Sequence, residues 1–133
     1  FNQHLVDGLI ARARETLVAA GVAAAQLEPV RVPGSHEVPW AAQALAQTGQ
    51  FDCVIGLGVL IAGDTNHHEM VGNSVSQALQ QVALNTGVPI INGVIVVNSV
   101  AQAEARCVGP INRGAEFAAA ALEMAVLKQK FSR

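Results

Sequence analysis

The chain has 133 residues, a length typical of one domain, and we expect a single domain over residues 1–133. Hydrophobic residues make up 51% of it and charged residues only 14%, against roughly a quarter in typical soluble proteins, which favours extra buried surface such as a subunit interface. The net charge of -2 and the absence of a basic stripe argue against nucleic acid, and no apolar run is long enough to cross a membrane. Cys53 and Cys107 lack a CxxC or metal-ligand spacing and are interpreted as buried free thiols of a cytoplasmic protein.

Helices and strands are predicted in alternation along the chain. Asn2 is a plausible N-cap of a first helix whose apolar residues recur over 5–17, and Gly21 ends that helix. A strand over 27–32 comes next, followed by a helix with Pro39 in its first turn and 40–45 in its body. A buried strand over 51–61 leads to a helix with an apolar stripe over 71–83, which Gly87 ends. The last elements are a strand over 88–97, a short helix from Ser99 to about Cys107, and a helix over 113–130. This order predicts an α/β fold, a three-layer sandwich with a central parallel sheet flanked by helices. Ligands of such sheets bind beyond the carboxyl ends of the strands.

The loop over 63–68 is the most informative of the loops that follow strands. It precedes a helix, so its backbone N–H groups and the positive end of the helix dipole favour an anion, and Thr65 adds a hydroxyl donor. Histidine is the residue type best suited to exchange protons at physiological pH, so His67 suits a phosphorylated substrate that is protonated and dehydrated. The alternative is that Asp64 or Thr65 only caps the helix while His67 faces solvent. The loop taken alone favours this plainer interpretation.

Two further segments carry candidate binding groups. In the turn over 33–37, Glu37 would orient a polyol or an amine by accepting hydrogen bonds, and it would equally well make local contacts at a helix start. Arg106 would grip a phosphate through its fork of N–H groups, although a solvated arginine is the commoner case. His4 and His68 have no identifiable partner in the sequence, and neither is given a role.

Taken together and in this order, these segments resemble the lumazine synthase family. The likeness lies in residues 1–2, 32–39, 58–67, 87–94, 102–106 and 112–125, and the GDTxH pattern of the 63–68 loop is its most specific part. The resemblance implies a cofactor-free transferase of riboflavin biosynthesis. Such an enzyme condenses 5-amino-6-(D-ribitylamino)uracil with 3,4-dihydroxy-2-butanone 4-phosphate to 6,7-dimethyl-8-ribityllumazine, releasing phosphate. It also implies a site between neighbouring subunits of a homopentamer, with a decamer or a 60-subunit shell as larger assemblies, and a first strand before Phe1 that is missing from these 133 residues.

The resemblance also assigns roles residue by residue, with no metal among them. His67 would donate and accept protons, Asp64, Thr65 and Arg106 would bind the phosphate, and Phe1, Ser35, His36, Glu37, Val59, Leu60, Ile61 and Asn92 would lie against the pyrimidine ring and its ribityl chain. Four positions depart from the family pattern: His36 replaces an aromatic residue, Ala62 an arginine, Asn92 a ring-facing aromatic near the end of the last strand, and Arg113 a lysine. Two weaker alternatives stay open, a flavin- or pyrimidine-binding module without turnover and a mainly structural, shell-forming protein.

Overall fold

A computed structural model describes residues 2–63 and 67–132. The predicted site residues Phe1, Asp64 and Thr65 therefore lie outside the described residues. The elements in chain order are α1 (Gln3–Ala19), η1 (Ala24–Gln26), η2 (Ser35–Glu37), α2 (Val38–Gln47), β1 (Val54–Ile61), α3 (His67–Thr86), β2 (Ile90–Val97), α4 (Val100–Cys107) and α5 (Arg113–Phe131). Among the helices in these two ranges, none is long and apolar enough to cross a membrane.

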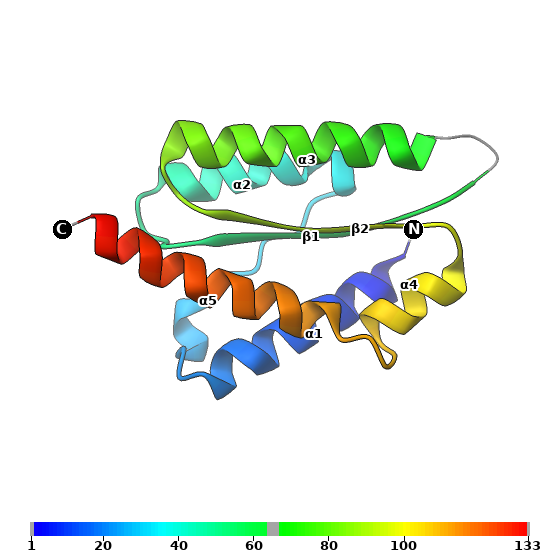
Figure 1. Cartoon of the computed structure of the whole chain (residues 1–133), viewed down its shortest axis with the longest axis horizontal. Helices are drawn as coiled ribbons and strands as arrows, with labels where there is room; N and C mark the ends of the chain where they lie inside the picture. The colour runs from blue at the N-terminus through cyan, green and yellow to red at the C-terminus, as the bar shows by residue number, and fades with distance from the viewer. Residues whose placement is uncertain (1, 64–66, 133) are drawn as a thin grey trace.

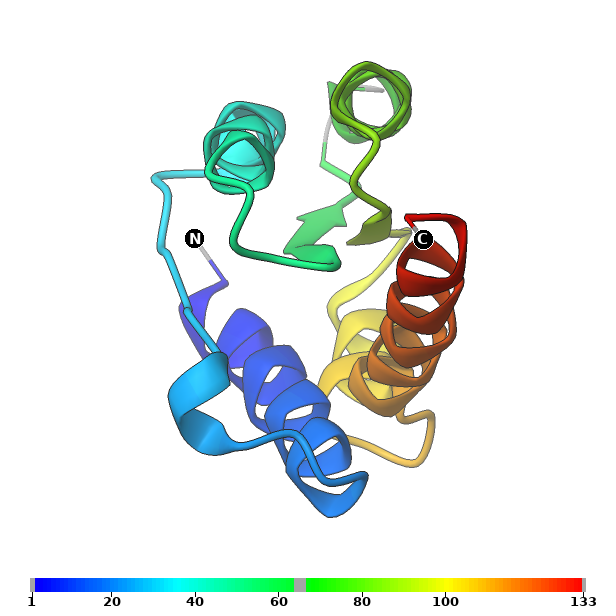
Figure 2. The same ribbon diagram turned by 90° about the vertical axis from the view of Figure 1, so that its left-hand side faces the viewer.

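The two described strands form the middle layer of the molecule. β1 and β2 pair in parallel, in register from Val54 opposite Ile90 to Ile61 opposite Val97. Helices α2 and α3 cover one face of this sheet, and α1, α4 and α5 cover the other (Figure 1). The view along the strands shows the same three layers, with the sheet between the two groups of helices (Figure 2). The predicted α/β class and three-layer sandwich are confirmed.

Each face of the sheet has its own hydrophobic core. On the α1 side the fully buried Leu5 and Leu9 pack with Phe117 of α5 and Ile95 of β2. On the α3 side Leu79 belongs to a second cluster, which also contains residues of α2 and β1 and against which partly buried residues of β2 pack. Because successive side chains of a strand point to opposite faces, one short apolar strand supplies both cores.

The first helix shows which local signals hold. Leu5 and Leu9 are both 0% exposed, as the four-residue spacing predicts. Gly21 has a φ of +100°, and its N–H donates to the Val18 carbonyl oxygen, so the glycine ends the helix as predicted. Asn2 occupies the N-cap position, but its side chain makes no capping hydrogen bond, and that part of the prediction was wrong.

The strand predicted over 27–32 is absent, and this prediction was wrong. The segment follows η1 as an irregular connection in which Val30 is 54% exposed and Arg31 bonds to Asp7 of α1 at 2.6 Å. Figure 2 shows this connection running apart from the sheet. A strand needs a neighbouring strand to bond its backbone N–H and C=O groups, and β1 is paired only with β2 among the described residues. Apolar composition alone therefore does not make 27–32 a strand.

Candidate functional site

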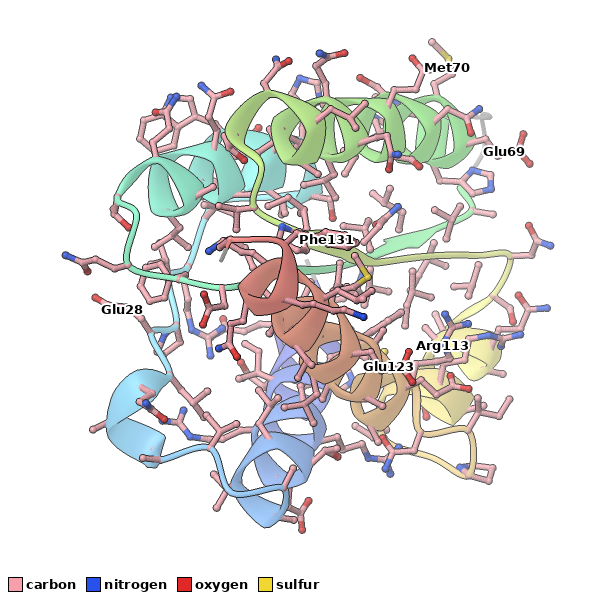
Figure 3. The ribbon with its side chains drawn as sticks, turned by 60° about the vertical axis from the view of Figure 1, so that its left-hand side comes forward. Glu28, Glu69, Met70, Arg113, Glu123 and Phe131 are labelled. Atoms are coloured by element: carbon pink, nitrogen blue, oxygen red, sulfur yellow. The ribbon has the colours of Figure 1, made fainter. Side chains whose placement is uncertain are left out.

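The carboxyl ends of the two strands define one edge of the sheet. β1 ends at Ile61 and β2 at Val97, directly opposite each other. His67 is the first residue of α3 and is exposed. Figure 3 shows Glu69 and Met70 in the same first turn of α3, pointing outward from the molecule. The first N–H groups of a helix have no partners within the helix, so this turn favours an anion next to the His67 imidazole.

The predicted turn over 33–37 lies directly against β1. Its residues Ser35–Glu37 form η2, which leads into α2 with Pro39 in the first turn of that helix. A Cβ atom at Gly58 would lie only 2.5 Å from the Ser35 hydroxyl oxygen. The glycine therefore lets η2 pack onto the strand at a distance that no other residue would allow.

The side chains of η2 differ in exposure. Ser35 and Glu37 are half-buried and His36 is exposed. The Glu37 carboxylate bends back, with Oε1 3.3 Å from where a Cβ at Gly34 would stand. It makes no hydrogen bond to any described residue. A half-buried carboxylate in this state is ready to accept hydrogen bonds from hydroxyl or amine groups.

Val59, Leu60 and Ile61 form the last three residues of β1, as the predicted site requires. The Val59 side chain is buried in the core on the α1 side, so it is the backbone and not the side chain that is available to a ligand. The strand edge facing away from β2 has no strand beside it among the described residues. Backbone N–H and C=O groups along that edge supply donors and acceptors beside η2.

Two predicted residues do not join this group within one chain. Asn92 is the third residue of β2 and lies opposite Gly56, so about 16 Å of strand separates it from the carboxyl edge. Its assignment to the end of the last strand was wrong, because that strand continues to Val97. Arg106 lies on α4, which covers the opposite face from α3, and its Nη1 donates to the Gln102 carbonyl oxygen.

Comparison with known proteins identifies the chain. The family model for 6,7-dimethyl-8-ribityllumazine synthase matches residues 1–129. The chain belongs to this family. The 6,7-dimethyl-8-ribityllumazine synthase of Xanthomonas oryzae pv. oryzae (strain PXO99A) is 43% identical over 130 residues, which cover 97% of this chain and 84% of the relative. That of Xylella fastidiosa (strain 9a5c) is 44% identical over 131 residues, covering 98% of this chain and 85% of the relative.

The family match confirms the resemblance predicted from the motifs. It confirms the expectation of an enzyme as well, a transferase associated with riboflavin biosynthesis. The predicted site residues fall into two groups on the described chain. His67, η2 and the end of β1 lie on one side of the carboxyl edge, while Asn92 and Arg106 lie elsewhere on the chain.

His68 is the residue that sequence reasoning missed. It is 7% exposed, the one buried polar side chain among the described residues, and neither ring nitrogen has a hydrogen-bond partner. Its Nε2 lies 3.9 Å from Oε1 of the exposed Glu69 side chain. A signal was present, since 68 shares its helix face with the buried positions 72, 75, 79 and 82 of α3. The predicted stripe began only at 71 and left this histidine out.

Three titratable groups of the described residues have shifted pKa values, and all three lie outside this site. Burial raises the pKa of the half-buried Cys53 thiol to about 11, and burial also raises the pKa of Cys107. Both thiols are free, as predicted, although Cys53 is only half-buried. Hydrogen bonds from Gln129 and Lys128 of α5 lower the pKa of Asp52, at the opposite edge of the sheet from His67. The two hydrogen bonds to Asp52 hold α5 to the start of β1.

Proposed function

We propose that this chain condenses 5-amino-6-(D-ribitylamino)uracil with 3,4-dihydroxy-2-butanone 4-phosphate. The products are 6,7-dimethyl-8-ribityllumazine, phosphate and water. The observation that carries the proposal is the position of His67, the first residue of a helix of 20 residues, just beyond the end of β1 in a chain of the lumazine synthase family. Both substrates are small molecules, and we assign no cofactor or metal to the reaction. The two free thiols suit the reducing cytoplasm, where we place the enzyme.

The proton transfers of this reaction are assigned to His67. Imine formation, loss of phosphate and ring closure each move protons, and a positioned histidine contributes roughly 10²–10⁴-fold to such steps. The exposed imidazole is accessible to a substrate, and the start of α3 attracts the phosphate group that leaves. Holding the two substrates together supplies much of the remaining acceleration. Asp64 and Thr65 are proposed as further phosphate contacts and Phe1 as a ring contact, although all three lie outside the described residues.

The ribityl chain and the pyrimidine ring are assigned to η2 and the end of β1. Ser35 offers a hydroxyl group and Glu37 a carboxylate without a hydrogen bond to any described residue, and ribityl hydroxyl groups complement both. The backbone of Val59, Leu60 and Ile61 adds further hydrogen-bonding groups next to them. His36 is exposed on the same turn, at the rim of this surface.

Asn92 and Arg106 are assigned to the site of a neighbouring copy in a homopentamer. Their separation from His67 within one chain supports this assignment. A second support is the outer layer of α2 and α3, because residues 38–47 of α2 and 70–86 of α3 contain no Asp, Glu, Lys or Arg. Trp40 is 75% exposed there and Leu84 is 72% exposed. Depletion of charge together with exposed large apolar side chains is typical of surfaces that pack against another subunit.

Intersubunit complementation tests the shared site. His67→Ala and Arg106→Ala chains are inactive separately if each residue is needed. After mixed refolding, about a quarter of the sites would combine an intact His67 from one copy with an intact Arg106 from its neighbour. Recovery to about a quarter of wild-type activity is therefore expected. No recovery in mixed oligomers would place both residues in the site of a single copy. Sedimentation separates a pentamer from a decamer or a 60-subunit shell.

The enzymatic proposal itself is tested by following the absorbance of lumazine. We expect an active wild-type chain and a loss of at least tenfold, about 1.4 kcal/mol of transition-state stabilisation, in each of the two variants. His4→Ala, at an exposed position on α1, is the matched control and should keep full activity. A folded, pentameric wild-type chain without product would overturn the proposal. Flavin titration would then test the binding module, which the missing aromatic ring at Asn92 favours.

A further inference from the structure

The position of His68 follows from how α3 crosses the sheet. Along α3, Leu79 packs against Gly56 of β1, and Gly72 packs against Leu60 of β1 and Val96 of β2. The helix therefore runs toward the carboxyl ends of the strands as its residue numbers fall. His68 precedes Gly72 by one turn, about 6 Å, on the same helix face. Its imidazole consequently lies under the first turn of α3, just beyond the ends of the strands.

The chemical state of this imidazole is unusual. The ring is buried, and neither Nδ1 nor Nε2 has a hydrogen-bond partner among residues 2–63 and 67–132. The carboxylate of Glu69 approaches only to 3.9 Å and belongs to a side chain that is 61% exposed. Buried polar groups in proteins nearly always have partners, and an exception calls for a specific explanation such as a bound group. His68 thus has an unused donor at the edge where the proposed substrate binds.

We propose that His68 is a second histidine of the site, which donates a hydrogen bond from its buried imidazole to a phosphate oxygen of the substrate. This inference rests on the proposed function, in which the phosphate binds at the start of α3. Imidazole carries an N–H in either protonation state, so the donation requires no change of charge. The ring is already desolvated and fixed by packing, so little is lost when the hydrogen bond forms.

The consequence is selectivity for the phosphorylated substrate. The phosphorylated substrate gains a hydrogen bond to His68 that a ketone without the phosphate group cannot make, and it therefore binds more tightly than such an analogue. His67 then carries the proton transfers, while His68 contributes to recognition of the phosphate. The two neighbouring histidines differ in exposure, as these two roles require.

His68→Phe tests this role, because phenylalanine fills the space of the ring without its nitrogens. We expect the Tm to rise by a few degrees, since two unpaired buried nitrogens are removed. The Kd for inorganic phosphate, measured by calorimetry, should rise about tenfold. The KM for 3,4-dihydroxy-2-butanone 4-phosphate should rise by a similar factor, and the KM for the pyrimidine substrate should not change. His68→Asn keeps an N–H donor and should recover part of the phosphate affinity.

The outcomes separate this inference from the proposed function. His4→Phe is the matched control and should leave the Kd for phosphate unchanged. If the wild-type chain makes lumazine but His68→Phe binds phosphate with unchanged Kd, His68 only packs, and the inference is overturned while the function stands. If His68→Phe weakens phosphate binding in a chain that makes no lumazine, the inference stands and the function fails. Should His68→Phe not fold, an unchanged Kd in His68→Leu would equally overturn the inference.

Discussion

Gly58→Ala should damage activity more than stability. The glycine lies in the middle of β1, and an added Cβ would stand 2.5 Å from the Ser35 hydroxyl oxygen and 3.4 Å from its Cβ. Ordinary contacts begin at 3.4 Å, so the hydroxyl group must move by about 0.9 Å. Ser35 belongs to η2, the turn proposed to hold the ribityl chain. A displacement of about 1 Å in a positioning group lowers rates by up to roughly 10²-fold, or about 2.7 kcal/mol.

The effect on folding should be smaller. Overpacking costs about 1–3 kcal/mol, whereas replacing a glycine in a strand regains about 0.4–1 kcal/mol through the unfolded chain. The free energy of unfolding should therefore fall by only about 1 kcal/mol, as measured in urea. The kcat/KM for lumazine formation should fall by a larger factor. Gly114→Ala, at the contact between α5 and α1 and away from η2, should show the opposite balance.

A double-mutant cycle decides whether the collision with Ser35 is the cause. Ser35→Ala removes the hydroxyl group and leaves ordinary contacts of 3.4 Å with the Cβ of residue 35 and 3.5 Å with Val94 Cγ1. The Gly58→Ala/Ser35→Ala chain should then be as active as Ser35→Ala alone, with a coupling energy close to the whole effect of Gly58→Ala. Strictly additive losses would show that the two positions act independently. Wild-type activity in Gly58→Ala would refute the close packing of η2 as a requirement for the site.

Three further predictions concern stability. Gly114→Ala would set a Cβ 2.7 Å from the Leu9 carbonyl oxygen and should cost about 2 kcal/mol in urea unfolding, because backbone and not a flexible side chain opposes it. Asn112→Ala removes the oxygen that accepts from the Ala115 N–H at 3.0 Å and should cost about 1 kcal/mol, while Asn112→Ser should recover most of it. Burial raises the pKa of Cys53 from 9.0 to about 11, so the native state keeps a proton that the unfolded chain loses. Stability should thus fall as the pH rises from 9.0 toward about 11, and Cys53→Ala should flatten that dependence in thermal melts.

The fold was predictable where residues signal their structure locally. The periodic apolar residues of α1, the proline at the start of α2 and the Ser99 cap of α4, whose oxygen accepts from the Gln102 N–H at 3.1 Å, all act within one or two turns. The segment over 27–32 failed because a strand depends on a partner that no local pattern reveals. The second strand begins at Ile90 and not at the predicted 88, because Pro89 has no N–H to donate to the neighbouring strand.

The site was predictable as far as chain order reaches. His67 and η2 lie in segments that local sequence motifs mark as loops or helix starts next to strands. Their positions beside β1 could therefore be expected from a parallel sheet. Asn92 was misplaced even though its strand was correctly predicted to end at 97, because only the register with Gly56 fixes its height in the sheet. His68 was overlooked because a polar residue type on a buried helix face breaks the binary pattern on which sequence reasoning depends.

The low charge content and the divided site have one explanation in common. The α1 and α5 layer carries ion pairs such as Arg31–Asp7 and Arg113–Glu116, whereas residues 38–47 of α2 and 70–86 of α3 carry no charged residue. A random distribution of charged residues would not leave one layer without charge, whereas a subunit interface over α2 and α3 would favour the absence of charge there. The same interface would bring the Arg106 of one copy toward the His67 of another. A chain that sediments as a monomer at enzymatic concentrations, yet forms lumazine, would contradict both points at once, since a monomer has no neighbour to complete its site.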